Sequence, residues 1–255
     1  DVLHDVIEKF VSDEINLSPN DRKSPDGRAQ PGLSNLGMGY VFEELIRKFN
    51  EENNEEAGEH FTPSEVIKLM TNLVFIPVKD QLPNPLTIYD PACGSGGMLT
   101  ESQDFITDPD GEVKAKVGVF LYGKEVNPET YAICKSDMMI KGNDPENIKF
   151  GSTLATDDFS GTRFDFMLTN PPYGKSWKSD LERLGGKDGI KDPRFVIEHA
   201  GDPEYSLITR SSDGQMLFLA NMLSKMKHGT PLGSRIAAWV SGSAKLSRNT
   251  PAPLR

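Results

Sequence analysis

From residue 86 onwards, short apolar runs alternate with longer stretches that carry apolar residues at helical spacing. Five runs are predicted to be strands, at residues 86–89, 117–122, 148–150, 164–169 and 235–240, with helices expected at about 97–106, 128–141 and 213–227. Strands that alternate with helices in this way form a parallel sheet with helices on both faces. The pattern therefore predicts a doubly wound, mostly parallel α/β fold, whose ligands bind beyond the carboxyl ends of the strands.

The chain ahead of this region is predicted to be largely helical. Residues 1–18 and about 36–50 each place apolar residues on one helix face, and the Pro/Gly-rich stretch 20–32 predicts a loop between them. Thr62 and Pro63 suit the cap and the first turn of a further helix. We therefore expect a helical segment, a catalytic domain and an irregular tail, at 1–57, 58–240 and 241–255.

The predicted strand at 164–169 ends at Asn170-Pro171-Pro172-Tyr173, because two prolines cannot continue a sheet. Proline has no N–H, so this turn offers carbonyl oxygens and the Asn170 side-chain oxygen as acceptors, with an aromatic ring beside them. An amino group on a flat ring carries two N–H donors that match such a cradle. Acceptors that hold both hydrogens free the nitrogen lone pair for attack. The alternative is an ordinary strand-ending turn, since Asn-Pro often starts turns.

A glycine-rich turn follows the predicted strand at 86–89. It runs from Asp90 to Leu99 as DPACGSGGML, and its glycines allow a ligand to approach the backbone closely. A dinucleotide fingerprint needs glycine where Leu99 stands, and Asp90 suits an ammonium group better than a pyrophosphate. Glu125, at the end of the next strand, can accept from both ribose hydroxyls. A ligand with an ammonium group near Asp90 and a ribose near Glu125 is a nucleoside attached to an amino acid, and S-adenosylmethionine is such a molecule. The alternative is an ordinary glycine-rich turn and a solvated glutamate.

Composition limits the other classes of function. The chain has 255 residues, a formal net charge of −10, two cysteines and four scattered histidines. The negative charge argues against unaided binding to a nucleic-acid backbone, so a basic partner or local patch must supply that affinity if DNA is the substrate. The cysteines form no disulfide framework and fit a reducing cytoplasm, and no apolar run is long enough to span a membrane. We expect no metal site.

The order of the motifs resembles one family. GEHFTP at 58–63, DPACGSGGML at 90–99, Glu125 and NPPYG at 170–174 occur in the order seen in the modification (methylase) subunits of type I restriction–modification systems. The resemblance extends from about residue 33 to about residue 236. It implies a Rossmann-like, S-adenosylmethionine-dependent methyltransferase that acts on adenine in DNA after the base is flipped from the duplex. It also implies a DNA-specificity subunit as partner, with a restriction subunit as a second candidate.

This resemblance assigns roles to individual residues. Asn170, Pro171 and Tyr173 would hold the amine of the target adenine, and Tyr173 would also stack on the flipped base. Pro172 belongs to the same catalytic motif. Glu125 would contact the ribose of the cofactor. Two further segments would also contact the cofactor, through Glu59, His60, Phe61, Thr62, Pro63 and Ser64 in the first and through Asp90, Ala92, Gly94, Ser95, Gly96, Gly97, Met98 and Leu99 in the second.

Two features depart from the family pattern. Residues 151–154 are Gly-Ser-Thr-Leu, where the family usually carries Gly-Asp-Thr-Leu, so Ser152 stands in place of an acidic residue expected on the cofactor adenine. Asp157 and Asp158 are candidate substitutes. Family members also continue past the fifth strand with further strands and helices, whereas the tail here is rich in Pro, Ser and Arg, and we expect an incomplete sheet.

Several alternatives remain open. Lys175, Trp177 and Lys178, at the start of a long polar loop predicted over 174–212, could touch a DNA strand or could belong to a mobile surface loop. Methylation of a cytosine ring carbon would need a nucleophilic cysteine in the cradle, and neither Cys93 nor Cys134 lies there, which excludes that class. The rival functions are methylation of a glutamine amide in a protein and a non-catalytic, cofactor-binding or scaffolding role.

Overall fold

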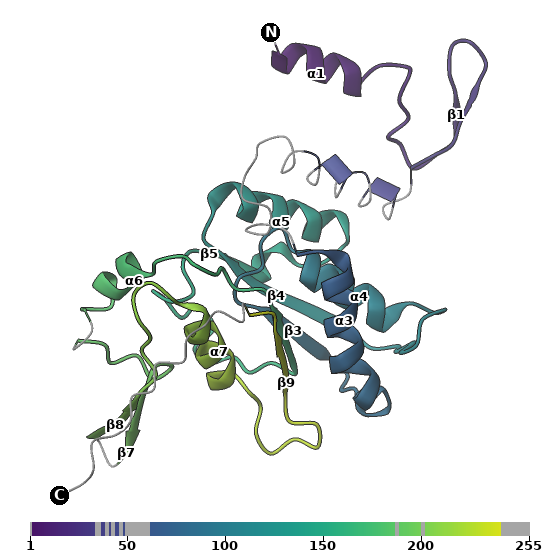
Figure 1. Cartoon of the computed structure of the whole chain (residues 1–255). Coiled ribbons are helices and arrows are strands. Elements are labelled where there is room, and N and C mark those ends of the chain that lie inside the picture. The colour runs from purple at the N-terminus through teal and green to yellow at the C-terminus, as the bar shows by residue number, and fades with distance from the viewer. Residues whose placement is uncertain are drawn as a thin grey trace, which may run out of the picture.

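The computed structural model describes residues 2–33, 62–186, 189–199 and 202–240, together with single positions between 37 and 48. Its centre is a sheet of five strands in the order β5-β4-β3-β6-β9, and each neighbouring pair is parallel. In chain order the strands are β3 (Leu86–Asp90), β4 (Val119–Glu125), β5 (Ile148–Phe150), β6 (Phe166–Thr169) and β9 (Arg235–Ala238). The predicted parallel α/β sheet is confirmed (Figure 1).

Helices cover both faces of this sheet (Figure 1). They are α3 (Ser64–Phe75), α4 (Gly97–Thr107), α5 (Pro128–Ile140) and α7 (Gln215–Ser224). Leu86 and Ile88 of β3 pack with apolar residues of α3, α4 and α5, whereas Tyr89 packs on the other side with Phe159 and with Met222 of α7. Successive strand residues point to opposite faces, so a strand that is apolar throughout must be covered on both. The doubly wound arrangement follows from that requirement.

The order of the sheet reverses next to β3. From β3 the chain moves outward to β4 and β5, and it then returns to place β6 on the other side of β3. Such a reversal leaves a crevice at the carboxyl ends of the two central strands, where α/β proteins bind ligands. Asp90 ends β3 and Asn170 follows β6, so the two motifs found in the sequence meet at this crevice.

The segment between β6 and α7 is folded, and the predicted long polar loop at 174–212 is wrong. It contains α6 (Lys178–Arg183) and an antiparallel hairpin of β7 (Val196–His199) and β8 (Asp202–Ser206). Trp177, Ile190 and Phe195 are buried in one cluster with Leu217 and Phe218 of α7. These apolar residues are too widely spaced to show a helix or strand period, and only the fold collects them into a core.

Two predictions for the N-terminal part also need correction. The helix predicted over 1–18 is α1 (Val2–Phe10), and the stretch at 20–32 contains a small hairpin of β1 (Arg22–Lys23) and β2 (Ala29–Gln30). The Asn16 side-chain amide donates to the carbonyls of Asn20 and Gln30 at 3.0 and 3.1 Å, which stabilises the hairpin. The predicted helix at 36–50 lies mostly, and the tail at 241–255 entirely, outside the described residues.

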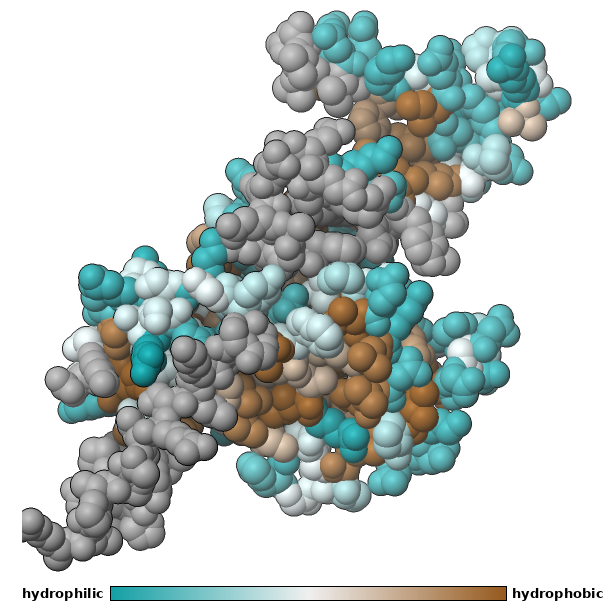
Figure 2. All heavy atoms as spheres, viewed as in Figure 1, coloured by the Kyte–Doolittle hydropathy of each residue, from teal (hydrophilic) through white to brown (hydrophobic). Residues whose placement is uncertain are grey.

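Short 3-10 segments complete the described structure, η1 (Ile76–Gln81) and η2 (Pro145–Asn147). Within the described ranges, none of the helices combines the length and the apolar character that crossing a bilayer requires. Figure 2 shows apolar atoms gathered on the face where α3 lies, and Leu69 and Leu73 of that helix are 49% and 62% exposed.

Candidate active site

Asp90 is the last residue of β3 and is only 2% exposed. Its Oδ1 atom accepts a hydrogen bond of 2.6 Å from the Thr169 hydroxyl at the end of β6, and one of 2.9 Å from the Ala92 amide. Burial raises the pKa of Asp90 to about 7, although these two hydrogen bonds act in the opposite direction. A buried carboxyl that ionises near neutral pH is suited to pair with a cationic group.

The glycine-rich turn adopts backbone conformations that favour glycine. Gly94 and Gly96 have φ angles of +56° and +96°, and Gly96 is the residue from which α4 starts. A Cβ atom on Gly96 would lie 2.9 Å from Sγ of Cys134, so α5 packs directly against the turn. The local conformation and the close packing both require glycine here.

Glu125 connects this turn to the next one. Its Oε2 accepts from the Gly94 amide at 3.0 Å, and its Oε1 accepts from the Asn127 amide at 2.7 Å. A carboxylate offers about four acceptor positions, so further ones remain for a ligand's hydroxyl groups. Asn127 also caps α5, because its side-chain oxygen accepts from the amides of Glu129 and Thr130.

Asn170 presents an acceptor that nothing satisfies within the described structure. Its Nδ2 donates to the Thr62 hydroxyl at 3.2 Å, whereas its Oδ1 is buried without a hydrogen-bond partner among the described residues. Thr62 was expected to cap α3, and that prediction is wrong, because Pro63 occupies the cap position and no side chain caps the helix. Thr62 instead lies at the Asn170 cradle, next to the carboxyl end of β6.

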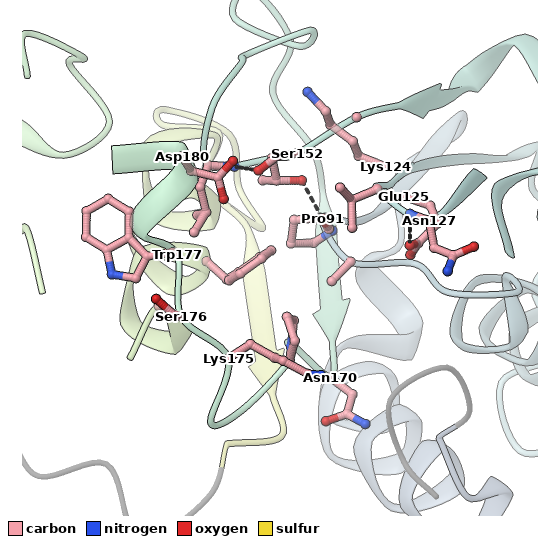
Figure 3. Close-up of a pocket in the computed structure, with 18 residues that line it drawn as sticks. Pro91, Lys124, Glu125, Asn127, Ser152, Asn170, Lys175, Ser176, Trp177 and Asp180 are labelled. Atoms are coloured by element: carbon pink, nitrogen blue, oxygen red, sulfur yellow. Dashed lines mark hydrogen bonds between the residues drawn. The ribbon is translucent and has the colours of Figure 1, made fainter. Parts of the chain in front are cut away.

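A cavity of about 390 Å³ extends from Glu125 to Asn170 (Figure 3). Its lining comes from the ends of β3, β4 and β5, from the NPPY turn and from the segment that follows it. The lining residues are Pro91, Ala92, Lys124, Glu125, Val126, Asn127, Gly151, Ser152, Thr153, Leu154, Asn170, Pro172, Lys175, Ser176, Trp177, Asp180, Gly214 and Phe218. The size suits a small-molecule ligand.

The structure brings some of the predicted site residues to the cavity and leaves others aside. Ala92, Glu125, Asn170 and Pro172 line it. Those that do not line it are Asp90, Gly94, Ser95, Gly96, Gly97, Met98, Leu99, Pro171 and Tyr173, as well as Thr62, Pro63 and Ser64. Ser64 borders a separate groove between α3 and α4. Glu59, His60 and Phe61 lie outside the described residues.

The far wall of the cavity was not predicted. For Trp177 the sequence left open a DNA contact or a mobile surface loop, but the side chain is 3% exposed, and its indole N–H donates to the Arg210 carbonyl at 2.7 Å. Gly214 approaches both Trp177 and Leu154, since a Cβ atom there would lie 3.3 Å from each side chain. The sequence feature that could have indicated this wall is the Gly-Ser-Thr-Leu turn after β5, because its Leu154 packs in one cluster with Trp177 and Phe218.

Asp157 and Asp158 do not replace the missing acidic residue, because neither lines the cavity. Asp157 pairs with Lys225 at 2.6 Å, and Asp158 pairs with Lys124. Both lysine side chains are 1% exposed, and burial lowers the pKa of each. The two aspartates supply the opposite charges that these buried cations require. Asp180 of α6 is the carboxylate that lines the cavity on this side (Figure 3).

Known proteins resemble this chain over most of its length. A family model described as N-6 DNA Methylase matches residues 34–233. The chain is 29% identical to the HindI methylase subunit, a type I restriction enzyme subunit of Haemophilus influenzae, over 55% of this chain and 30% of that protein. It is 30% identical to the MpnII methylase subunit of Mycoplasma pneumoniae, over 62% of this chain and 28% of that protein. It thus matches less than a third of either relative's length.

Solved structures give the same fold. A type I restriction–modification methyltransferase subunit from Streptococcus thermophilus superposes with a TM-score of 0.54 and 27% identity, over 75% of this chain and 36% of that one. A Listeria monocytogenes protein described as a class I S-adenosylmethionine-dependent methyltransferase has a TM-score of 0.50 and 16% identity, which shows the fold alone. The Rossmann-like methyltransferase fold and the resemblance inferred from the sequence are confirmed. Because the family model covers most of the chain, including strands β3 to β6 and all the residues that line the cavity, this protein belongs to the N-6 DNA methylase family.

Proposed function

We propose that this chain carries the catalytic domain of a DNA methyltransferase that moves a methyl group from S-adenosylmethionine to the exocyclic amine of adenine. The buried Asn170 Oδ1, which has no partner among the described residues, carries this proposal. An unsatisfied buried acceptor is costly unless a ligand supplies the donor. An amine bound at the cavity would supply that donor.

The residues present fit S-adenosylmethionine as the methyl donor. Asp90 is a buried carboxyl that can pair with the ammonium group, and Glu125 retains acceptor positions for the ribose hydroxyls. Ser152, Thr153 and Val126 line the part of the cavity next to Glu125, where the base would lie. Bound there, the cofactor supplies a methyl group on a positively charged sulfur.

The protein's part in the reaction is to position and polarise the amine. Asn170 Oδ1 and the Pro171 carbonyl are two acceptors that can hold the two hydrogens of the amine. Held in this way, the nitrogen lone pair turns from the ring toward the incoming methyl group, and alignment supplies most of the rate enhancement. The nitrogen becomes acidic once methylated and can then release a proton, so no strong base is required beforehand. Tyr173, at 53% exposed, is available to stack on an extruded base.

We infer that a partner subunit recognises the DNA. The chain's net charge of −10 gives it little attraction for phosphates. Its relatives include methylase subunits of type I restriction enzymes. We infer that a DNA-specificity subunit brings the substrate, that a restriction subunit can join the same assembly, and that the complex works in the cytoplasm. The division of the chain into an N-terminal helical segment (1–57), a catalytic domain (58–240) and an irregular tail (241–255) is part of the same proposal.

The test is transfer of a labelled methyl group to adenine in DNA by the chain together with its specificity subunit. Asn170→Ala is expected to lower the rate by about 100-fold or more, as does loss of one preorganised hydrogen-bonding group in other enzymes, while cofactor affinity stays within about twofold. Asn147→Ala, in η2 and away from the cavity, is the matched control.

Other outcomes of this assay would contradict the proposal. Methylation of a glutamine peptide in place of DNA would assign the cradle to a protein amide. An assembled wild-type complex that binds cofactor and DNA but transfers no methyl group would make this chain a scaffold.

A further inference from the structure

Ser152 lines the cavity directly after β5, and both acceptor positions of its hydroxyl are occupied. Its Oγ accepts from the backbone amides of Leu154 at 3.2 Å and Ala155 at 3.4 Å. Figure 3 shows Ser152 among the lining residues. A serine hydroxyl has two acceptor lone pairs and one O–H donor. Two amides fill the lone pairs, so what the hydroxyl can still offer a ligand is its hydrogen.

Arg194 holds the same two peptide groups from the opposite side. Its Nη1 donates to the Thr153 carbonyl at 2.6 Å, and its Nη2 donates to the Leu154 carbonyl at 3.3 Å. In a planar trans peptide the carbonyl and the N–H point in opposite directions. The carbonyls of Thr153 and Leu154 therefore point to Arg194 while the following amides, those of Leu154 and Ala155, point to Ser152.

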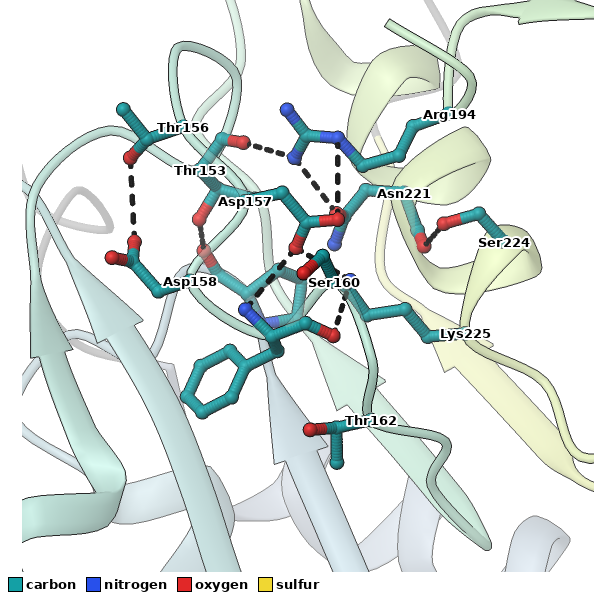
Figure 4. Close-up of polar contacts among 12 residues, drawn as sticks. Thr153, Thr156, Asp157, Asp158, Ser160, Thr162, Arg194, Asn221, Ser224 and Lys225 are labelled. Atoms are coloured by element: carbon teal, nitrogen blue, oxygen red, sulfur yellow. Dashed lines mark hydrogen bonds and ion pairs between the residues drawn. The ribbon is translucent and has the colours of Figure 1, made fainter.

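Arg194 is itself held by several polar contacts, and Figure 4 shows those to Thr153 and Asn221. It is 4% exposed, and its Nε and Nη2 bind the Asp192 carboxylate at 3.0 and 2.6 Å. Its Nη1 also donates to Asn221 Oδ1 at 3.1 Å, and the Asn221 amide donates to the Tyr89 hydroxyl at 3.3 Å. A guanidinium forks in a fixed plane, so it can set both carbonyls at once.

This network joins the two sides of the cavity. Thr153, one of the two residues clamped by Arg194, donates its hydroxyl to the Pro91 carbonyl in the glycine-rich turn. Tyr89 immediately precedes Asp90 on β3. Arg194 thus contacts the part of the cavity next to Glu125 through Thr153 and Leu154, although it lies well beyond the NPPY motif in the sequence.

We propose that Ser152 is a hydrogen-bond donor aimed at a ring nitrogen of the cofactor's purine, and that Arg194 is the positioning residue that sets its direction. The inference rests on the proposed function, since it assumes that the nucleoside lies beside Glu125. A carboxylate at this position would accept from the exocyclic amine of the purine. A hydroxyl whose two lone pairs are already occupied can only donate a hydrogen bond. At this position the chain therefore binds an acceptor atom on the edge of the purine, a ring nitrogen, and not the exocyclic amine.

The experiment compares S-adenosylhomocysteine with its 1-deaza, 3-deaza and 7-deaza analogues, in each of which one ring nitrogen is replaced by C–H. Binding to the full chain is measured by calorimetry for the wild type and for Ser152→Ala. One analogue is expected to bind the wild type about five- to tenfold more weakly than the parent compound, the worth of one good hydrogen bond. Ser152→Ala should bind that analogue and the parent compound equally well, which a merely structural effect of the substitution would not produce.

Each result decides between the two proposals. If S-adenosylhomocysteine binds but every analogue loses the same factor in the wild type and in Ser152→Ala, the inference is overturned and the proposed cofactor stands. If the folded wild-type chain does not bind S-adenosylhomocysteine, the proposed cofactor falls and the inference falls with it.

Arg194→Lys tests the positioning role, because it keeps the charge but lacks the fork that reaches two carbonyls. It should reduce the discrimination against the same analogue. Lys225→Met is the control. It perturbs the same buried polar cluster, since Asp157 faces both Lys225 and Arg194, yet Lys225 donates no hydrogen bond to Thr153 or Leu154. Equal discrimination in Arg194→Lys and in the wild type would limit Arg194 to a structural role. Ser152→Ala keeps the donor assignment testable even where Arg194→Lys does not fold.

Discussion

The two walls of the cavity are built in different ways. One wall contains Glu125 and Asn170, with Asp90 buried next to the lining residue Pro91. It consists of turns directly after parallel strands, and its groups are held by hydrogen bonds to backbone amides and to Thr62. The opposite wall consists of Trp177, Gly214 and Phe218, which come from separate segments and are held by apolar packing. The first wall carries the polar groups that would bind a ligand, and the second sets the shape of the cavity. Substitutions in the first wall should therefore lower ligand affinity, whereas substitutions in the second should lower folding stability.

The largest effect is expected for Trp177→Ala in the packed wall. Truncating a large buried aromatic side chain costs about 3–5 kcal/mol of folding free energy, and here it also removes the indole hydrogen bond to Arg210. Urea unfolding measures the loss. The other tryptophan, Trp239, is 47% exposed, and Trp239→Ala should change stability by about 0.5 kcal/mol or less. Equal effects of the two substitutions would remove the distinction between the walls.

The strand-end wall should respond in ligand affinity. Glu125→Ala removes a charged acceptor and is expected to weaken S-adenosylhomocysteine binding by about 10- to 100-fold, with a smaller change in stability. Calorimetric titration measures this loss. Glu129→Ala, in the first turn of α5 and outside the cavity lining, should leave affinity unchanged. Loss of affinity in both variants would indicate general damage to α5 rather than loss of a ligand contact.

Gly214→Ala sharpens the comparison from the packed side. The added methyl group would lie 3.3 Å from both Leu154 and Trp177, and such overpacking typically costs about 1–3 kcal/mol. Thermal unfolding compares it with Gly161→Ala, where the added atom meets nothing within 4 Å. A Gly214→Ala chain as stable as Gly161→Ala would show that this wall tolerates rearrangement.

The smallest expected effect is a pH dependence on the strand-end side. Because the pKa of Asp90 is raised to about 7, the carboxyl is partly protonated below neutral pH, and a cationic ligand must displace that proton. Affinity for S-adenosylhomocysteine should therefore rise by about tenfold from pH 6 to pH 8. The same raised pKa makes the ligand-free fold less stable as pH increases from about 4 toward 7, since the folded state holds the proton more tightly.

Asp90→Asn tests this assignment, because it keeps the shape of the side chain and removes its titration. Calorimetry across the pH range should give a flat affinity profile for this variant. A slope equal to that of the wild type would assign the pH dependence to another group.

The sequence by itself determined the sheet and the strand-end wall. Apolar runs alternating with helical periodicity specify a parallel sheet, and the residues after β3, β4 and β6 must lie at its carboxyl edge, because the chain has nowhere else to turn. Asp90, Glu125 and Asn170 could therefore be placed near one another from their order alone. Each of them acts within a few residues of the strand that positions it.

Only the tertiary structure decided the packed wall and the network behind Ser152. Arg194 reaches the carbonyls of Thr153 and Leu154 across a separation of about 40 residues, and Trp177 packs against residues equally distant in sequence. Such contacts depend on how separate segments share a limited volume, which no local period records. The donor character of Ser152 arises in the same way, because it depends on peptide groups that a distant arginine holds in place.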